Sequence, residues 1–198
     1  MRRQQIINAA CVLFNQMGTQ AVSTQDIASA CGISKKTLYQ LFESKDLLIE
    51  AVVESLIDKS GQLLGTALKE QEPLTQMLNL LKSAQQIAQL FSTPFFHGLK
   101  KYYHNAFRLL SHFIQTEFLS KMMEVIQSGK NQNVFVRSMD SRMLVNLYCW
   151  QMQNAISDKS LPQENREQIF RYIGHFFLLG ILKDRSIIIT EPEMSSQI

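Results

Sequence analysis

The stretch that most constrains how this chain can fold is 24–42, TQDIASACGISKKTLYQLF. Thr24 offers a hydroxyl at a helix start, and Asp26 places a negative charge in the first turn, where the helix dipole favours it. Gly32 is the residue type most able to adopt the left-handed conformation that ends a helix. Ser34 is a second N-cap residue and begins another short helix. The pattern therefore predicts two short helices joined by a tight turn.

The second helix of this pair has an apolar side and a polar side. Leu38, Leu41 and Phe42 fall on one side and are expected to point inward. The polar side chains lie near the helix start and on its outer side: Lys35, Lys36, Thr37, Tyr39 and Gln40. A short helix braced by apolar residues, with cations and hydrogen-bond donors facing outward, suits the major groove of DNA. A helix over about 4–17, with Phe14 and Met17 on its apolar side, is expected to support the pair.

Many positions between residues 6 and 53 agree, at fixed spacing and without a gap, with one known pattern. They are Ala9, Ala10, Leu13, Phe14, Gly18, Thr24, Asp26, Ile27, Ala28, Gly32, Ile33, Ser34, Thr37, Leu38, Tyr39, Phe42, Ser44, Lys45, Leu47 and Leu48. On these residues, roughly the first quarter of the chain resembles the DNA-binding domain of the TetR family of transcriptional repressors. The resemblance implies a dimeric regulator that binds a palindromic operator and is released by a small-molecule effector.

The same resemblance assigns roles to individual side chains. It implies that Thr24 and the Tyr39 hydroxyl are phosphate ligands, together with Lys45 and the amide groups that open the next helix. Position 36 carries lysine where the family often has glycine, so Lys36 contacts either a base or a phosphate. The full set of candidate DNA-binding residues is Thr24, Gln25, Ser34, Lys35, Lys36, Thr37, Tyr39 and Lys45. Arg2 and Arg3 either reach the DNA or remain solvated.

The rest of the chain has a helical pattern. Four prolines and eight glycines in 198 residues, with few β-branched runs, favour an all-α fold. We expect about nine helices, in a three-helix DNA-binding domain over 1–46 and a helical effector-binding and dimerisation domain over 47–198. A helix over about 45–69 links the two. Residues 95–129 are expected to form two helices, and 134–136 an extended turn that buries one aromatic side chain.

The last two expected helices, over 141–157 and 163–183, carry unusually wide apolar bands. In the final helix the band covers more than half of the circumference, so it must be buried on two sides. Two such helices from each chain, paired across a two-fold axis, form a four-helix bundle. We therefore expect a homodimer through these two segments.

The middle of the chain is rich in aromatic side chains and histidines. An apolar cavity with a few polar groups is the usual form of a ligand site, although any one of these residues taken alone is more typical of ordinary core. The candidate residues for binding an unidentified small-molecule effector are Phe91, Phe95, His97, Tyr103, Phe107, Phe113, Met122 and Trp150.

Other classes of function find little support in the sequence. No nucleophile, phosphate-loop or zinc-protease motif occurs, so we expect neither an enzyme nor any catalytic residue, metal or cofactor. The three cysteines lack metal-ligand spacing and fit a reducing cytoplasm, and no apolar run is long enough to span a membrane. A net charge of +3 is too small to indicate DNA binding by itself. The alternative to a regulator is a helical ligand-binding or protein-interaction module without sequence-specific DNA binding.

Overall fold

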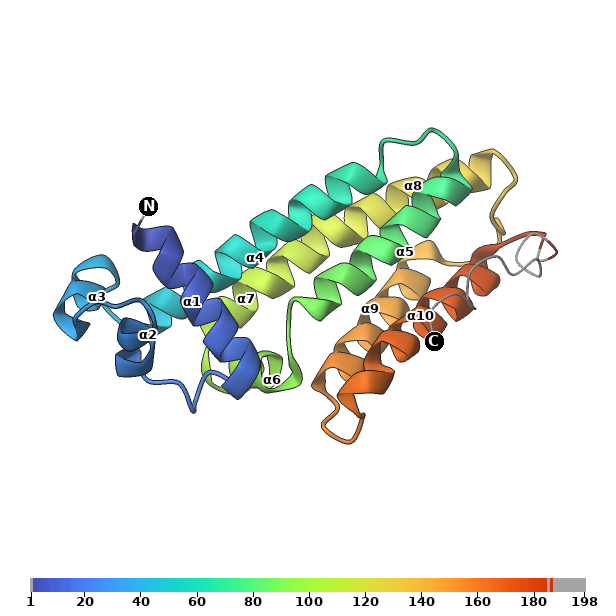
Figure 1. Ribbon diagram of the computed structural model, residues 1–198. Helices are drawn as coiled ribbons and strands as arrows, with labels where there is room; N and C mark the ends of the chain where they lie inside the picture. Colours follow the sequence, from blue (N-terminus) through green and yellow to red (C-terminus); the bar gives the residue numbers. More distant parts are fainter. Residues whose placement is uncertain (1, 185, 187–198) are drawn as a thin grey trace.

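A computed structural model describes residues 2–184 and 186 of the protein, and over these residues the fold is all-α (Figure 1). The elements are α1 (Arg2–Met17), α2 (Thr24–Ala30), α3 (Lys35–Leu41), α4 (Lys45–Ala67), α5 (Pro73–Gln89), α6 (Thr93–Tyr102), α7 (His104–Phe113), a π-helical segment η1 (Ile114–Phe118), α8 (Leu119–Asn131), α9 (Ser141–Ser157) and α10 (Gln163–Ile181). Because α7, η1 and α8 follow one another without a break, the described part of the chain contains nine separate helices, as expected.

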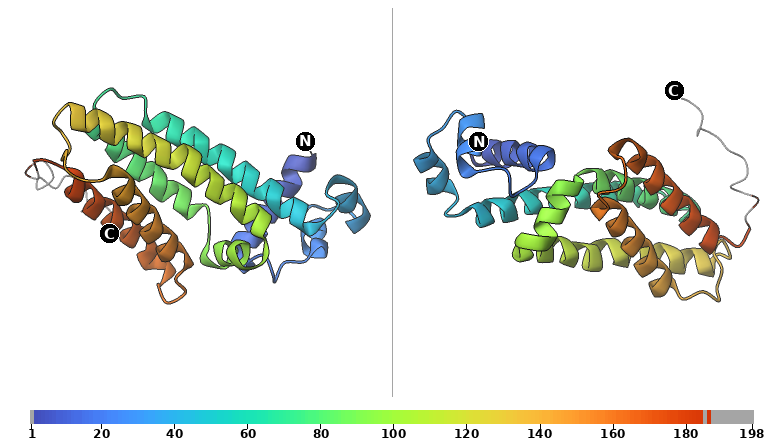
Figure 2. Two further views of the ribbon diagram at one scale, coloured as in Figure 1. Left: turned by 180° about the vertical axis from the view of Figure 1, so that it is seen from behind. Right: turned by 90° about the horizontal axis from the view of Figure 1, so that it is seen from below.

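The helices form an elongated molecule with α1, α2 and α3 gathered at one end (Figure 1). From that end α4 runs along α5 and α7, and α5 also packs against α8 and α10. The rod of α7, η1 and α8 lies alongside α4, and α9 and α10 lie side by side at one flank (Figure 2). α6 bridges the two ends, because it contacts α1 on one side and α7 and α9 on the other.

Most helix ends follow from local sequence. α1 ends at Gly18, whose φ of +79° is accessible to glycine at little cost. α5 begins at Pro73, which is well suited to a first helical turn because that turn needs no N–H from it. The break between α6 and α7 falls at Tyr103, within the 95–129 segment for which the sequence predicts two helices. The expectation that Met17 belongs to the apolar side of α1 is wrong, since its side chain is exposed.

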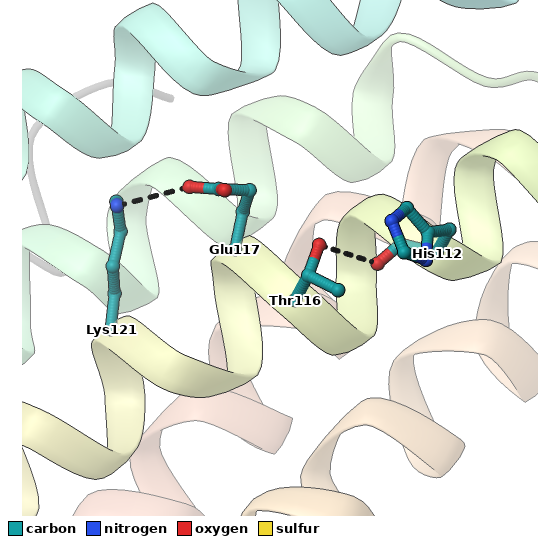
Figure 3. Close-up of polar contacts among 4 residues, drawn as sticks. All are labelled: His112, Thr116, Glu117 and Lys121. Carbon is teal, nitrogen blue, oxygen red and sulfur yellow. Dashed lines mark hydrogen bonds and ion pairs between the residues drawn. The ribbon is translucent and has the colours of Figure 1, made fainter.

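The π-helical segment interrupts an otherwise regular rod. The amide of Leu119 donates to the carbonyl of Ile114, five residues earlier, where an α-helix would pair residues four apart. On the outer side of this segment, Thr116 Oγ1 donates to the His112 carbonyl at 2.9 Å, and Lys121 forms an ion pair with Glu117 at 3.2 Å (Figure 3). Such insertions change which side chains face inward over one turn, and they are frequent at functional sites.

The segment between α8 and α9 is an extended turn that buries one aromatic side chain, as the sequence predicted. Phe135 is fully buried and lies directly against Gly129 of α8. The amide of Val136 donates to the Ile181 carbonyl at 2.8 Å, and the amide of Lys183 donates to the Val134 carbonyl at 3.0 Å. These bonds fasten the end of α10 to the turn. Within the described residues, no helix combines the length and the apolar character needed to cross a bilayer.

Candidate nucleic-acid interface and effector cavity

α2 and α3 form a helix-turn-helix whose ends are fixed by side-chain caps. Ser23, rather than Thr24, is the N-cap of α2: its hydroxyl accepts from the Asp26 amide, and the Asp26 carboxylate accepts from the Ser23 amide at 2.8 Å. Gly32, with φ of +63°, turns the chain after α2. Ser34 then caps α3 by accepting from the Thr37 amide at 3.1 Å.

Apolar residues brace α3 from behind. Leu38 is completely buried and Phe42 nearly so, and both pack in the core that Ile27 and Ala28 of α2 also enter. The expectation that Leu41 points inward is wrong, because 38% of this residue is exposed. With only seven residues, α3 can present one narrow stripe to the core, and that stripe ends at Leu38 and Phe42.

The outer face of α3 carries the predicted polar residues. Ser34, Lys35, Lys36 and Tyr39 are exposed, and Thr37 is half-buried. Among the described residues ion pairs form only within α10 and between η1 and α8, so neither lysine of α3 is neutralised by a carboxylate. This face therefore presents free positive charge and hydroxyl groups to the solvent.

Tyr39 is positioned by two neighbours. Its hydroxyl lies 3.4 Å from Thr24 Oγ1, and the ammonium of Lys35 lies 5.8 Å from the centre of its ring. Thr24 is buried, whereas 41% of Tyr39 is exposed, so the tyrosine covers the threonine. Gln25 is exposed on α2, where its amide donates to Ser29 Oγ at 3.3 Å.

Lys45 stands at the start of α4 and is already engaged within the chain. Its ammonium donates to the Thr19 carbonyl at 2.6 Å, in the turn between α1 and α2. Partial burial lowers the pKa of Lys45, and the nearby carboxylates of Asp46 and Asp26 oppose this shift. Ser44 caps the helix by accepting from the Leu47 amide. Lys45 thus ties the first turn of α4 to the turn that leads into the helix-turn-helix.

A second feature is an apolar cavity in the other part of the molecule. Its volume is about 70 Å³, and its walls come from α5, α6, α7, η1 and α9. Large side chains line it: Phe91, Phe96, Phe113, Phe118, Tyr148 and Met152. The π-helical segment contributes Ile114 and Phe118 to this wall.

Comparison with known proteins identifies the arrangement of α1–α4. A sequence profile described as "Bacterial regulatory proteins, tetR family" matches residues 6–52. YvaF, an HTH-type transcriptional regulator of Bacillus subtilis (strain 168), is 31% identical over 144 residues, which cover 71% of this chain and 74% of YvaF. This chain belongs to the tetR family. It is a DNA-binding transcriptional regulator and not an enzyme, as the sequence predicted.

Two further relatives extend the likeness beyond α4. KstR2 of Rhodococcus jostii (strain RHA1), an HTH-type transcriptional repressor, is 25% identical over 144 residues, 70% of either chain. The crystal structure of AibR in complex with isovaleryl coenzyme A and operator DNA has a TM-score of 0.68 at 15% identity, covering 89% of this chain and 97% of that one. At that identity the likeness shows a shared fold.

The tetR-family fold places the eight candidate effector residues in several different environments. Phe91 and Phe113 line the cavity. Phe95, in the core, stacks with Phe14 at 5.8 Å between ring centres, while Met122 is buried in α8. Phe107 lies edge-on to Phe96, one layer behind the wall. The remaining three lie elsewhere: His97 in a cleft between α6 and the start of α10, Tyr103 in a separate depression beside α4, and Trp150 on the outer surface.

Sequence reasoning did not single out Tyr148 as a cavity residue. Nothing in an apolar stripe distinguishes a side chain that faces a cavity from one that faces another side chain. Within the described residues, no three His, Cys, Asp or Glu side chains lie close enough together to hold a metal ion. Desolvation lowers the pKa of His97, with the nearby lysines Lys159, Lys101 and Lys100 adding to the effect.

The outer face of α9 and α10 is apolar and exposed. Five large side chains contribute to it: Met143, Leu147, Trp150, Tyr172 and Phe176. Trp150 is 62% exposed, and the rings of Tyr172 and Phe176 stack on each other at 6.4 Å. Exposed apolar patches of this kind mark interaction surfaces.

Proposed function

We propose that this tetR-family regulator is a repressor that binds a palindromic operator as a homodimer and is released by a small apolar effector. The observation that carries the proposal is the outer face of α3, where Lys35 and Lys36 are exposed, unpaired by carboxylates, and backed by the buried Leu38. Residues 1–46 form the DNA-binding unit and 47–198 the effector-binding and dimerisation unit. Since its target is chromosomal DNA, the protein acts in the cytoplasm.

Individual residues of the interface take different roles. Lys35, Lys36 and Thr37 lie at the start of α3, the end of a recognition helix that enters the major groove, and they contact base edges or flanking phosphates. Tyr39 donates its hydroxyl to a phosphate, and Thr24 holds that hydroxyl in place from below. Ser34 and Gln25 flank the same surface.

The start of α4 supplies a further phosphate contact. The first amide groups of a helix bind anions, and Lys45 adds positive charge at that end. Because its ammonium is held by the Thr19 carbonyl, we assign Lys45 mainly to fixing the geometry of this helix start.

Dimerisation through α9 and α10 follows from their exposed apolar face. Pairing these two helices with their copies across a two-fold axis buries Trp150 and Phe176. A dimer places two α3 helices about 34–36 Å apart, one turn of DNA, so the operator has two half-sites related by symmetry.

A route from the cavity to the interface runs through α6. Phe96 of α6 lines the cavity, and Gly98, two residues later, lies against the side chain of Thr19. The Thr19 carbonyl accepts from Lys45 at the start of α4. An effector that moves α6 therefore moves the turn that anchors α4. The description of AibR, which names both a ligand and operator DNA, and that of KstR2 as a repressor support a ligand-responsive repressor.

The test selects DNA from a random pool with the purified protein and then measures affinity by fluorescence anisotropy over a range of salt. We expect palindromic enrichment. The Lys35→Ala/Lys36→Ala variant should reduce the salt dependence of binding by about one unit of log–log slope for each phosphate that it no longer touches. The matched control is Lys100→Ala/Lys101→Ala, which removes two exposed lysines of α6. Weak binding without enrichment, equal in both variants, would instead favour a helical module without sequence-specific DNA binding.

A further inference from the structure

A cleft lies where α6 meets the turn between α1 and α2 and the loop between α9 and α10. Its volume is about 580 Å³, within the roughly 300–1,000 Å³ of sites that bind small molecules. Unlike the apolar cavity, it is open to solvent and has polar walls. Three separate segments line it, with Thr19 and Gln20 from the turn, His97 and Lys101 from α6, and Lys159 from the loop. A ligand here would contact the DNA-binding end and the rest of the molecule at once.

Positive charge gathers around this cleft. Of the described residues that line it, Lys101, Lys159 and Arg166 carry a fixed positive charge, and Asp158 alone carries a carboxylate. The three cations come from α6, from the α9–α10 loop and from the start of α10. Among the side chains that the structure describes, none of them forms an ion pair. The cleft therefore has an excess of positive charge that the chain does not neutralise, and a concave surface of one sign attracts ligands of the opposite sign.

Arg166 shows the missing counter-charge most clearly. It is half-buried, and its guanidinium donates to Thr93 Oγ1 of α6. Desolvation lowers its pKa, and no described carboxylate pairs with it. The nearby carboxylates are engaged elsewhere, since Glu167 pairs within α10 and Asp158 accepts from the amide and the hydroxyl of Ser160. A partly buried charge without a counter-ion is unfavourable, so an anion from solution is the partner that this wall lacks.

The lysines of the cleft act on a common neighbour. Desolvation lowers the pKa of His97, and Lys159, Lys101 and Lys100 lower it further. Because Lys159 belongs to the α9–α10 loop and the other two lysines belong to α6, two segments bring like charges together across the cleft. These charges repel each other when the cleft holds only water, and an anion between them removes that repulsion. The neutral imidazole adds an N–H donor at the same place.

We propose that this cleft binds a compact polyanion, a small metabolite with two or more carboxylate or phosphate groups. Lys101 and Lys159 donate to its anionic groups, and Arg166 adds a third positive charge at the wall. The site is separate from the apolar cavity, because the two share no lining residue. It therefore goes beyond the proposed function and does not depend on what the cavity binds. Its ligand would lie beside Thr19, whose carbonyl accepts from Lys45 at the start of α4.

The experiment measures the binding of citrate, pyrophosphate and acetate to the full chain by isothermal titration at one ionic strength. We expect the tighter of the two polyanions to identify the recognised group as carboxylate or phosphate, and acetate to bind about tenfold more weakly than that probe. Lys159→Ala should weaken the tighter probe about fivefold, because it removes one exposed cation. Asp158→Asn should strengthen it by about the same factor, since it removes the carboxylate and keeps an oxygen that can accept from Ser160. Damage to the fold would not produce these opposite changes.

Two further variants locate the bound polyanion. Lys69→Ala alters an exposed lysine in the loop between α4 and α5, outside the cleft, and should bind the probes as wild type does. If Lys35→Ala/Lys36→Ala weakens binding as much as Lys159→Ala does, the probe occupies the DNA-binding face and the inference is overturned. It is overturned as well if neither polyanion binds more tightly than acetate, if Lys159→Ala and Lys69→Ala bind alike, or if Asp158→Asn does not strengthen binding. The titrations contain no DNA, so these outcomes leave the proposed repressor function standing.

Discussion

Replacing Gly98 by alanine should disturb the joint between α6 and the turn that joins α1 to α2. A Cβ at position 98 would lie 2.1 Å from Thr19 Oγ1, whereas real Cβ contacts essentially never fall below 3.0 Å. Thr19 is fully buried, and its carbonyl is held by Lys45. Its side chain therefore has little room to move away, and the two segments must separate by roughly 1 Å.

The magnitude follows from two opposing effects. Alanine is favoured over glycine inside a helix by about 1 kcal/mol, and overpacking a tight contact costs about 1–3 kcal/mol. Gly98→Ala should therefore range from neutral to about 2 kcal/mol destabilising. In a Thr19→Ala background the overlap with Oγ1 is removed, and the remaining contact, with the Cβ of residue 19 at 3.3 Å, needs a shift of only a few tenths of an ångström. There Gly98→Ala should stabilise by up to about 1 kcal/mol.

The assay is urea unfolding of wild type, both single variants and the double variant, at one protein concentration because dimerisation contributes to stability. The expected coupling between the two positions is about 1–3 kcal/mol. We also expect the single Gly98→Ala variant to bind operator DNA more weakly than the double variant, because it displaces the turn that Lys45 anchors. If Gly98→Ala stabilises the protein equally in both backgrounds, the contact does not constrain α6 and the reasoning is wrong.

Three further predictions concern local features of the fold. Gly129→Ala should lower the free energy of unfolding in urea by at least about 1 kcal/mol, because its Cβ would lie 2.0 Å from the buried ring of Phe135. Gly61→Ala, whose Cβ meets open space, should not lower it, and equal urea midpoints for the two variants would contradict this. Burial raises the pKa of Cys149 to about 12, so its alkylation rate should keep rising about tenfold per pH unit from pH 8 to 10. The measurement uses a variant in which the other two cysteines are replaced by serine, and a plateau near pH 9 would indicate an ordinary thiol. Ser34→Ala removes the N-cap hydrogen bond of α3, so it should lower the free energy of unfolding by about 1 kcal/mol and weaken DNA binding. An unchanged midpoint of thermal unfolding would mean that the cap is dispensable.

The local sequence predicted the helix-turn-helix well because its signals are short-range. Ser34 caps α3, and Gly32 has the positive φ that its position between two helices requires. Similar reasoning predicted α9 over residues 141–157 and the burial of one aromatic side chain within 134–136, which is Phe135. The inward orientation predicted for Leu41 is wrong, because a seven-residue helix turns only a narrow stripe to the core and periodicity alone does not give the width of that stripe.

By itself, the sequence predicted most helix ends to within a few residues, which family the first 50 or so residues resemble, and that a charged helix face is backed by apolar side chains. Only the tertiary structure decided that Phe91 and Phe113, of the eight candidates, meet at one cavity, and that Tyr148, in the wall of that cavity, has an unpaired hydroxyl. The physical reason is that caps and turns depend on neighbours a few residues away, whereas a cavity depends on how several helices distant in sequence rotate against one another as they pack. The π-helical turn at Ile114 adds to that rotation without any sequence signal that we could recognise.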